Sequence, residues 1–553
     1  MNRTRKNLRQ YFCALILLSG WPAVWGNDGG LQNLSHQPGL VWHWAGATQG
    51  EAFLNLKQIQ LIRESSDNFL GRQLDELVFG QLQSFDNTID EARFSPSGLG
   101  SEALKSELFL IHWPESGQGA ESFHGWTLAW KNAPEDSPLD QWFEKLTTLR
   151  KPSITQQKSE DGGLSLSLDS TSGSSRITCG KFNEWTHFSI FHGDHPEGFS
   201  PGYHLAEVLS PASGGNQPQE TLFSVSMDAQ RYRASLGQLD TYFSGTFPKI
   251  SLTGTVASST IRISGTFDFD EDVDIDLHPW RLPVETLRDP IVSLTAVRGL
   301  NSVLGKLSSN SSGLVPAVDQ FLMTGEFHGQ FSYGIRAFLP VPTGGAQGLE
   351  FDDLKSSAHL LMDGLLQKHP LGKLVQHPTL PRYSWLGLPI IIPYVEEISE
   401  ESNGRFVEFG SLPINADPKP IPEDLINQLR NTENLIAYDW ELTPLRATQL
   451  TSVMNIMQMV EFSTSLATVS KTGKVILKRD QKEFINITRS LSNLCENTVT
   501  FITRKSPRQW AFQRSGNLGL NSIEIIWLAH SLTVFSDGGR EIDAPVLIPP
   551  PGK

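Results

Sequence analysis

The stretch Leu435-Ile-Ala-Tyr-Asp-Trp-Glu-Leu442 opens the pattern around which the chain is organised. Its aromatic and β-branched residues form a short run that is typical of a strand. Apolar residues then return every three or four positions, which is the spacing of one helix face, at Leu445, Leu450, Val453, Met454, Met457 and Val460. Pro444 suits the first turn of this helix, where its missing N–H costs nothing. The sequence therefore predicts a strand that runs directly into an amphipathic helix.

The same order of strand and helix returns four more times along the chain. The copies are Leu40–Leu61, Trp126–Leu149, Leu222–Phe243 and Phe331–Leu366. These copies lie further apart than the roughly 20 to 50 residues of a solenoid repeat, so we read them as duplicated modules. The predicted fold class is α+β, with several modules of antiparallel sheet and helices packed on one face of each, like ferredoxin-like units.

The chain has 553 residues, which exceeds one hydrophobic core and predicts several domains. Linkers are predicted where Gly, Pro and Ser gather without periodicity, at Ser210–Gln219 and Leu412–Pro422. The expected organisation is a signal peptide (1–26), a flexible lead-in (27–38), an N-terminal α+β domain of two strand-helix units (39–209), a middle α+β domain of two units (220–411), a C-terminal α+β domain (423–535) and a Pro-rich disordered tail (536–553).

The first 26 residues have the pattern of a secretory signal. Basic residues, Arg3, Arg5, Lys6 and Arg9, precede a short apolar run, and small residues permit cleavage after Gly26. The run is too short to cross a bilayer comfortably, and no later stretch has the length and apolarity of a span. We therefore expect export to the periplasm or the exterior, with no membrane span after cleavage.

The net charge of −15 bears on the partners of the chain. An acidic surface repels phosphate, so nucleic acid is not an expected partner, whereas a protein or another envelope component is. Two cysteines follow the signal, Cys179 and Cys495. Both a disulfide between them, which export permits, and two buried free thiols fit the sequence.

The chain resembles a family of exported proteins of Gram-negative bacteria. The resemblance lies in Leu435–Glu441, in His278–Pro283 followed by Asp289–Gly299, and in the closing helix Gly519–Leu532. It implies export and repeated α+β units, and it implies no activity, cofactor or catalytic residue.

Alternating carboxylates are the first candidate metal site. Asp268, Asp270, Asp272 and Asp274 would share one face of a strand, where neighbours about 7 Å apart repel one another unless a cation such as Ca²⁺ binds. The alternative is a solvated edge strand whose charges discourage pairing with other sheets.

A cluster of histidines is the second candidate metal site. His187, His192, Asp194 and His195 offer imidazole and carboxylate ligands of the kind that hold Zn²⁺. The alternative is a polar, turn-forming loop.

No catalytic motif is complete in the sequence, so no catalytic or cofactor-binding residue is predicted. Lys471-Thr472-Gly473 lacks a Ser-x-x-Lys partner, and Gly-x-Ser-x-Gly and His-Glu-x-x-His are absent. The expected function is that of an exported, non-enzymatic binding or scaffolding protein of the cell envelope. A metal-assisted periplasmic hydrolase and a carrier of an apolar ligand are the alternatives.

Overall fold

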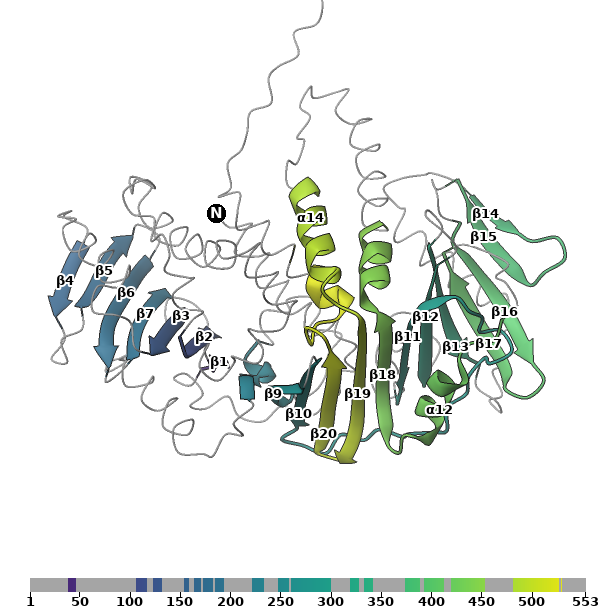
Figure 1. The fold of residues 1–553 in the computed structure, drawn as a ribbon, viewed down its shortest axis with the longest axis horizontal. Helices are drawn as coiled ribbons and strands as arrows, with labels where there is room; N and C mark the ends of the chain where they lie inside the picture. The colour runs from purple at the N-terminus through teal and green to yellow at the C-terminus, as the bar shows by residue number, and fades with distance from the viewer. Residues whose placement is uncertain are drawn as a thin grey trace, which may run out of the picture. The chain divides into compact units, whose positions relative to one another are not determined.

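The computed structural model (Figure 1) describes residues 38–45, 106–116, 123–131, 154–158, 164–170, 173–182, 185–192, 221–232, 247–257, 260–299, 319–327, 333–341, 373–387, 392–411, 419–452, 481–526 and 529. The chain divides into two compact units. The first contains Ala23–Val273 and Ile502–Gly519, and the second contains Asp274–Phe501 and Leu520–Lys553.

The first unit is built on an antiparallel sheet. Neighbouring strands pair in the order β4, β5, β6, β7, β3, β2, β1, β8, β9, β10, β20. Their bounds are β1 Leu40–Trp44, β2 Leu108–Ser116, β3 Phe123–Lys131, β4 Ile154–Lys158, β5 Leu164–Ser170, β6 Gly173–Phe182, β7 Trp185–His192, β8 Thr221–Asp228, β9 Lys249–Ala257, β10 Thr260–Asp268 and β20 Gln509–Gly516.

The second unit is also an antiparallel sheet. Its strands pair in the order β18, β11, β12, β13, β17, β16, β15, β14. Their bounds are β11 Ile291–Arg298, β12 Gln320–Phe327, β13 Tyr333–Pro340, β14 Lys373–Gln376, β15 Arg382–Leu386, β16 Tyr394–Glu400, β17 Gly404–Gly410 and β18 Leu435–Leu442. The boundary between the two units falls within β19 (Asn497–Ser506).

The predicted α+β fold of ferredoxin-like modules is wrong. Strands make up 56% of the described structure and helices 16%, so antiparallel sheet dominates. The physical reason is that stretches between the predicted repeats pair with one another as successive hairpins, as in β4 to β7 and β14 to β16. In sequence, β5 alternates leucine with serine, the period of two residues that is typical of a strand.

The prediction for the opening stretch is confirmed as far as residue 452, and the rest of the predicted helix, with Val453, Met454, Met457 and Val460, lies outside the described residues. Strand β18 covers Leu435–Leu442, and a helix covers residues 443–452 with Pro444 in its first turn. The strands predicted near residues 40, 126, 222 and 331 are present as β1, β3, β8 and β13. Most of the helices predicted after these four strands lie outside the described residues, as do the signal peptide, the lead-in and the tail.

Helices lie on both faces of β18, not on one. Gln428 of α12 (Glu423–Asn431) accepts a hydrogen bond from the Tyr438 hydroxyl at 2.5 Å. Arg446 of the helix over 443–452 donates to the next residue of the strand, Asp439, at 2.8 Å. Successive strand residues point to opposite faces, so the two helices cover opposite sides of the sheet. In the described part of the chain, every helix is too short or too polar to cross a bilayer.

The core of the second unit lies under α12. Leu425, Ile426 and Leu429 of this helix pack with Leu294 of β11 and Tyr438 of β18. A segment without regular structure, residues 278–290, adds Leu282 and Leu287 to the same cluster. The central strands are thus packed between layers, whereas β14 lies at the end of the strand order.

Candidate functional site

The hairpin of β14 and β15 forms one edge of the second unit's sheet. Lys373 lies opposite Leu386, and Gln376 lies opposite Tyr383. β15 pairs with β16 on its other side, whereas β14 pairs with β15 alone among the described strands. A strand in this position presents one row of backbone N–H and C=O groups that no described neighbour satisfies.

The hydrogen-bond pattern shows which residues of β14 supply that row. The backbone N–H of His377 donates to Arg382 O at 2.8 Å, and the N–H of Trp385 donates in the other direction, to Pro393 O at 2.7 Å. Bonded pairs alternate along an antiparallel ladder, so Val375 faces β15 while Leu374 and Gln376 direct their backbone groups outward. The free edge therefore offers the N–H and C=O groups of Leu374 and Gln376.

Two aromatic side chains fix the hairpin to the body of the sheet. Tyr383 and Trp385 are only 4% and 7% exposed, and Tyr383 packs with Val395 of β16 and Val407 of β17. On the other face of the hairpin, Arg382 donates to Glu396 from Nε at 2.8 Å and from Nη2 at 2.5 Å. These contacts hold the edge strand in a defined place, which limits the entropy lost when a partner binds.

Exposed apolar side chains accompany the free edge. Leu380 and Leu386 are 40% and 41% exposed, and they are two of the three large apolar side chains exposed in the described residues. The turn between the strands is closed by His377 Nδ1, which accepts from the backbone N–H groups of Leu380 at 3.1 Å and Thr379 at 3.3 Å. Unsatisfied backbone groups beside apolar surface are the features that a strand-adding partner uses.

A buried charge network lies in the same sheet. Arg336 of β13 donates from Nε to Glu326 of β12 at 2.5 Å and lies 3.4 Å from Glu408 of β17. The Tyr394 hydroxyl donates a short hydrogen bond to Glu408. Burial raises the pKa of Glu408, an effect that the nearby Arg336 opposes, and burial likewise raises the pKa of Tyr394. Both Glu side chains are 3% exposed, so this network is a buried link between β12, β13, β16 and β17.

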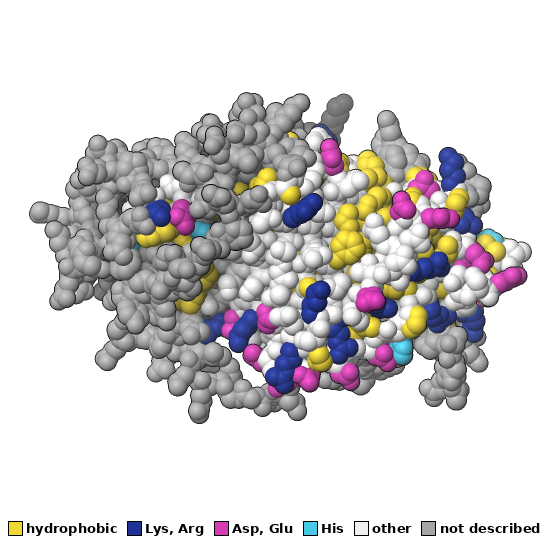
Figure 2. Space-filling model, turned by 60° about the horizontal axis from the view of Figure 1, so that its bottom comes forward, with side chains coloured by type: hydrophobic (Ala, Val, Ile, Leu, Met, Phe, Trp, Pro, Cys, Tyr) yellow, Lys and Arg dark blue, Asp and Glu magenta, His cyan; other side chains and the backbone are white. Residues whose placement is uncertain are grey.

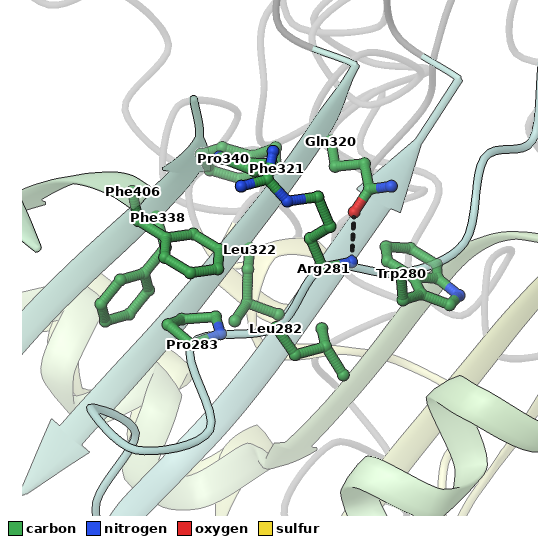
Figure 3. A pocket seen from close by; sticks show the side chains of 10 residues that line it. All are labelled: Trp280, Arg281, Leu282, Pro283, Gln320, Phe321, Leu322, Phe338, Pro340 and Phe406. Carbon is green, nitrogen blue, oxygen red and sulfur yellow. Dashed lines mark hydrogen bonds between the residues drawn. The ribbon is translucent and has the colours of Figure 1, made fainter. Parts of the chain in front are cut away.

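A crevice lies where the segment 278–290 crosses the sheet (Figure 3). Figure 3 shows Phe338 and Phe406 on one side and the Arg281 side chain extending toward Pro340. Its unfilled space is about 200 Å³ with the solvent at its mouth included, and no part of it is wide enough for a water molecule. This crevice therefore does not supply the internal cavity that an apolar carrier would require.

Arg281 serves as a cross-link beside this crevice. Its Nη1 donates to Val341 O at 2.6 Å, and its Nη2 lies 3.3 Å from Arg405 O. Gln320 fixes the backbone on both sides, because it accepts from Arg281 N–H at 2.9 Å and donates to Pro279 O at 2.7 Å. Burial lowers the pKa of Arg281, and its guanidinium lies over the Phe406 ring.

Of the predicted row of carboxylates, only Asp268 lies on a strand, and the other three follow it in a segment without strand pairing. β10 ends at Asp268, because its neighbours β9 and β20 reach no further. The next residues bond to the turn between β19 and β20: Phe269 N–H donates to Arg508 O, and Val273 N–H donates to Pro507 O. In this extended segment Asp270, Asp272 and Asp274 are exposed, whereas Phe269, Val273 and Ile275 are buried.

Several of these carboxylates have partners of their own. Gln509 donates to Asp268 at 2.7 Å, Lys249 to Asp270 at 3.1 Å and Arg508 to Asp272 at 2.5 Å. Among the residues that the structure describes, no three His, Cys, Asp or Glu side chains come together as a metal site. Calcium binding at this segment stays a prediction.

The histidine cluster is described in part. His187 lies in β7 opposite Ala129 and is 6% exposed, and His192 ends the same strand. The predicted ligands Asp194 and His195 lie outside the described residues. Zinc binding by these four residues therefore also stays a prediction.

Comparisons with solved structures found crystal forms of the protein TP0453. Form III has a TM-score of 0.20 and 8% identity, and the match covers 45% of this chain and 83% of that chain. Form I has a TM-score of 0.19 and 9% identity with the same coverage. No family model and no curated protein matches the chain. These TM-scores are too low for a conclusion about the fold or function of this chain.

Proposed function

We propose that this chain is an exported, non-enzymatic binding or scaffolding protein of the cell envelope, and that the β14 edge is its binding surface. The observation that carries the proposal is the outward row of backbone groups at Leu374 and Gln376. The exposed Leu380 and Leu386 of the same hairpin support it.

Strand addition explains how such an edge binds a polypeptide. An extended segment of the partner lies about 4.8 Å from β14 and satisfies the outward N–H and C=O groups. Those backbone bonds supply affinity, while side chains on alternate faces of the added strand supply specificity. Apolar side chains of the partner contribute most to the binding free energy on the face that carries Val375 and Leu386, because they bury apolar surface there.

The surface charge is compatible with a protein partner. Figure 2 shows basic and acidic side chains interspersed over the described part of one face, and no single sign dominates there. Mixed charge of this kind favours specific contacts with a protein over attraction to a polyanion. Export is supported by the basic and apolar pattern of the first 26 residues, and N-terminal sequencing of the secreted form tests it.

The test is a pull-down from envelope extract with three forms of the mature chain. Gln376→Pro removes an outward N–H without removing a bond to β15, and Gln376→Ala keeps that N–H. We expect the wild-type chain and Gln376→Ala to retain the same partner and Gln376→Pro to lose it. Equal capture by all three forms would show that binding does not use this edge.

A further inference from the structure

We propose that His377 makes the β14–β15 hairpin sensitive to pH, because a proton on its Nδ1 opens the turn and loosens the edge strand β14. As a means of regulating partner binding, this inference rests on the proposed function, since it concerns the same edge. The change in the hairpin itself needs no partner and is measured without one.

Three hydrogen-bond donors surround Nδ1 of His377. The backbone N–H of Leu380 donates to it at 3.1 Å, and the backbone N–H of Thr379 donates at 3.3 Å. The Thr379 hydroxyl lies 3.4 Å from the same atom and can donate as well. A neutral imidazole accepts through one ring nitrogen and carries its proton on the other, so the closed turn requires the proton on Nε2. A second proton, on Nδ1, removes the lone pair that these donors share.

The positive charges near His377 act in the same direction. Gln376 lies opposite Tyr383, so His377 lies opposite Arg382, and its N–H donates to Arg382 O at 2.8 Å. Protonation therefore places an imidazolium opposite a guanidinium, and like charges in this position destabilise a strand pair. Lys373 lies on the same face of β14, four residues away, and adds a further positive charge.

The carboxylates of the neighbouring strand β16 already have cationic partners. Glu396 accepts from both Nε and Nη2 of Arg382, at 2.8 Å and 2.5 Å. Glu397 accepts from Arg405 at 2.6 Å. A protonated His377 thus has to compete with these two arginines for a carboxylate, so ion pairing does not replace the bonds that the turn loses.

The length of β14 makes the turn important for the whole strand. β14 has four residues and, among the described strands, pairs with β15 alone. Loss of the two backbone bonds to Nδ1 should raise the population of the open hairpin about tenfold. Imidazole is the side chain that ordinarily changes its charge between about pH 5 and 8, so we expect the opening within that range. Tyr383 and Trp385 are buried and keep β15 in place when β14 opens.

Hydrogen exchange of the mature chain at about pH 7.5 and about pH 5.0 tests the opening, with rates corrected for intrinsic exchange. His377→Asn is the matched variant, because its side-chain oxygen accepts from the turn and does not take up a proton in this range. His377→Ala lacks an acceptor at either pH.

We expect the protection of the amides in residues 373–380 of the wild-type chain to fall about tenfold at the lower pH, to the level of His377→Ala. His377→Asn should keep its protection at both pH values. Equal changes in the wild-type chain and His377→Asn overturn the inference. A gap between the wild-type chain and His377→Ala that is the same at both pH values also overturns it, and this comparison does not depend on how well asparagine closes the turn.

The position of the proton supplies a second arm. In spectra of the chain labelled with ¹⁵N-histidine, the signals of His377 are those that disappear in His377→Ala. We expect Nδ1 to carry no proton at about pH 7.5 and to gain one at about pH 5.0. A proton on Nδ1 at the higher pH overturns the inference, because the turn is then closed without this acceptor.

Partner capture at the two pH values tests the regulation. We expect the wild-type chain to release its partner at about pH 5.0 and His377→Asn to retain it. Equal capture by both forms at both pH values overturns the regulatory role, even where the hairpin opens as expected. Capture by Gln376→Pro that equals capture by the wild-type chain overturns the proposed function instead, and the exchange result for the hairpin is unaffected.

Discussion

Ser522 donates both its backbone N–H and its hydroxyl to the carboxylate of Glu441, at 2.6 Å and 2.7 Å. The two residues are 81 positions apart, and Glu441 is completely buried. Ser522 is the first residue of a helix, and the N-terminus of a helix stabilises an anion. These two bonds therefore connect the start of the helix at Ser522 to β18 through the buried carboxylate of Glu441.

Arg446 balances that charge, and its loss is the first prediction. Its Nη1 donates to Glu441 at 2.9 Å and to Asp439 at 2.8 Å. Arg446→Met leaves two carboxylates without their cation, so we expect the free energy of unfolding to fall by about 3 kcal/mol. Urea denaturation followed by tryptophan fluorescence measures the change.

Arg508→Met is the control for this prediction. Arg508 bonds to Asp272 at 2.5 Å, and the pair is exposed to solvent, which screens such contacts. We expect no measurable shift of the urea midpoint in this variant. An equal loss in the two variants would mean that burial of Glu441 does not govern the effect.

The sequence predicted β18 and its helix because both signals are local. Apolar spacing and Pro444 lie within one window, and they need no knowledge of distant strands. The closing helix, predicted over Gly519–Leu532, begins at Ser522 in the structure, and most of its predicted residues after 526 lie outside the described part of the chain. Its start is fixed locally, since Asn521 and Glu524 bond to each other's backbone N–H groups.

The network of Arg336, Glu326 and Glu408 could not be foreseen from the sequence. Glu408 lies 72 positions from Arg336, and each charge occupies an inward position of a different strand. The only local signal is a charged residue between apolar neighbours, as in Phe406-Val-Glu-Phe409, which also fits a solvated face. The free edge at β14 was missed for a similar reason, because strand order depends on long-range pairing.

A matched pair of substitutions tests which carboxylate balances Arg336. Glu326→Gln keeps an oxygen that can accept from Arg336 but removes the negative charge from the 2.5 Å bond, and we expect a loss of about 2 kcal/mol at neutral pH. Glu408→Gln still accepts from Tyr394 and removes the second buried negative charge. We expect this variant to be at least as stable as the wild-type chain at neutral pH, as measured by urea denaturation.

The pH dependence of stability tests the role of Glu408 separately. The pKa of Glu408 is raised above its ordinary value of 4.5 because burial disfavours the charged form. The folded state then holds its proton at pH values where the unfolded state has lost it, so stability falls as the pH rises from about 4.5 through the folded pKa. Glu408→Gln should remove that fall. If the free energies of unfolding of the wild-type chain and of Glu408→Gln change in parallel as the pH rises above about 4.5, this prediction is wrong.

The reactivity of Cys495 is a further prediction. Its thiol is free and buried, and burial raises its pKa to about 12, with a smaller effect from Glu441. The thiolate is the reactive form, so the native chain should react very slowly with a disulfide reagent at pH 8. In a Cys179→Ser background, we expect rapid reaction only after denaturant is added. Fast reaction of the native variant would show that the site opens readily.

Gly404 tests how closely the segment 278–290 must approach the first residue of β17. Its φ of +86° belongs to the left-handed region, and a Cβ there would lie 2.7 Å from Arg281 Nη2. Gly404→Ala should therefore lower the free energy of unfolding by about 1–2 kcal/mol from backbone strain alone, with an added cost from the contact. Urea denaturation of Gly404→Ala, Arg281→Ala and the double variant separates the two effects. The steric part should vanish in the Arg281→Ala background while the strain remains, and strictly additive losses would mean that the guanidinium yields without cost.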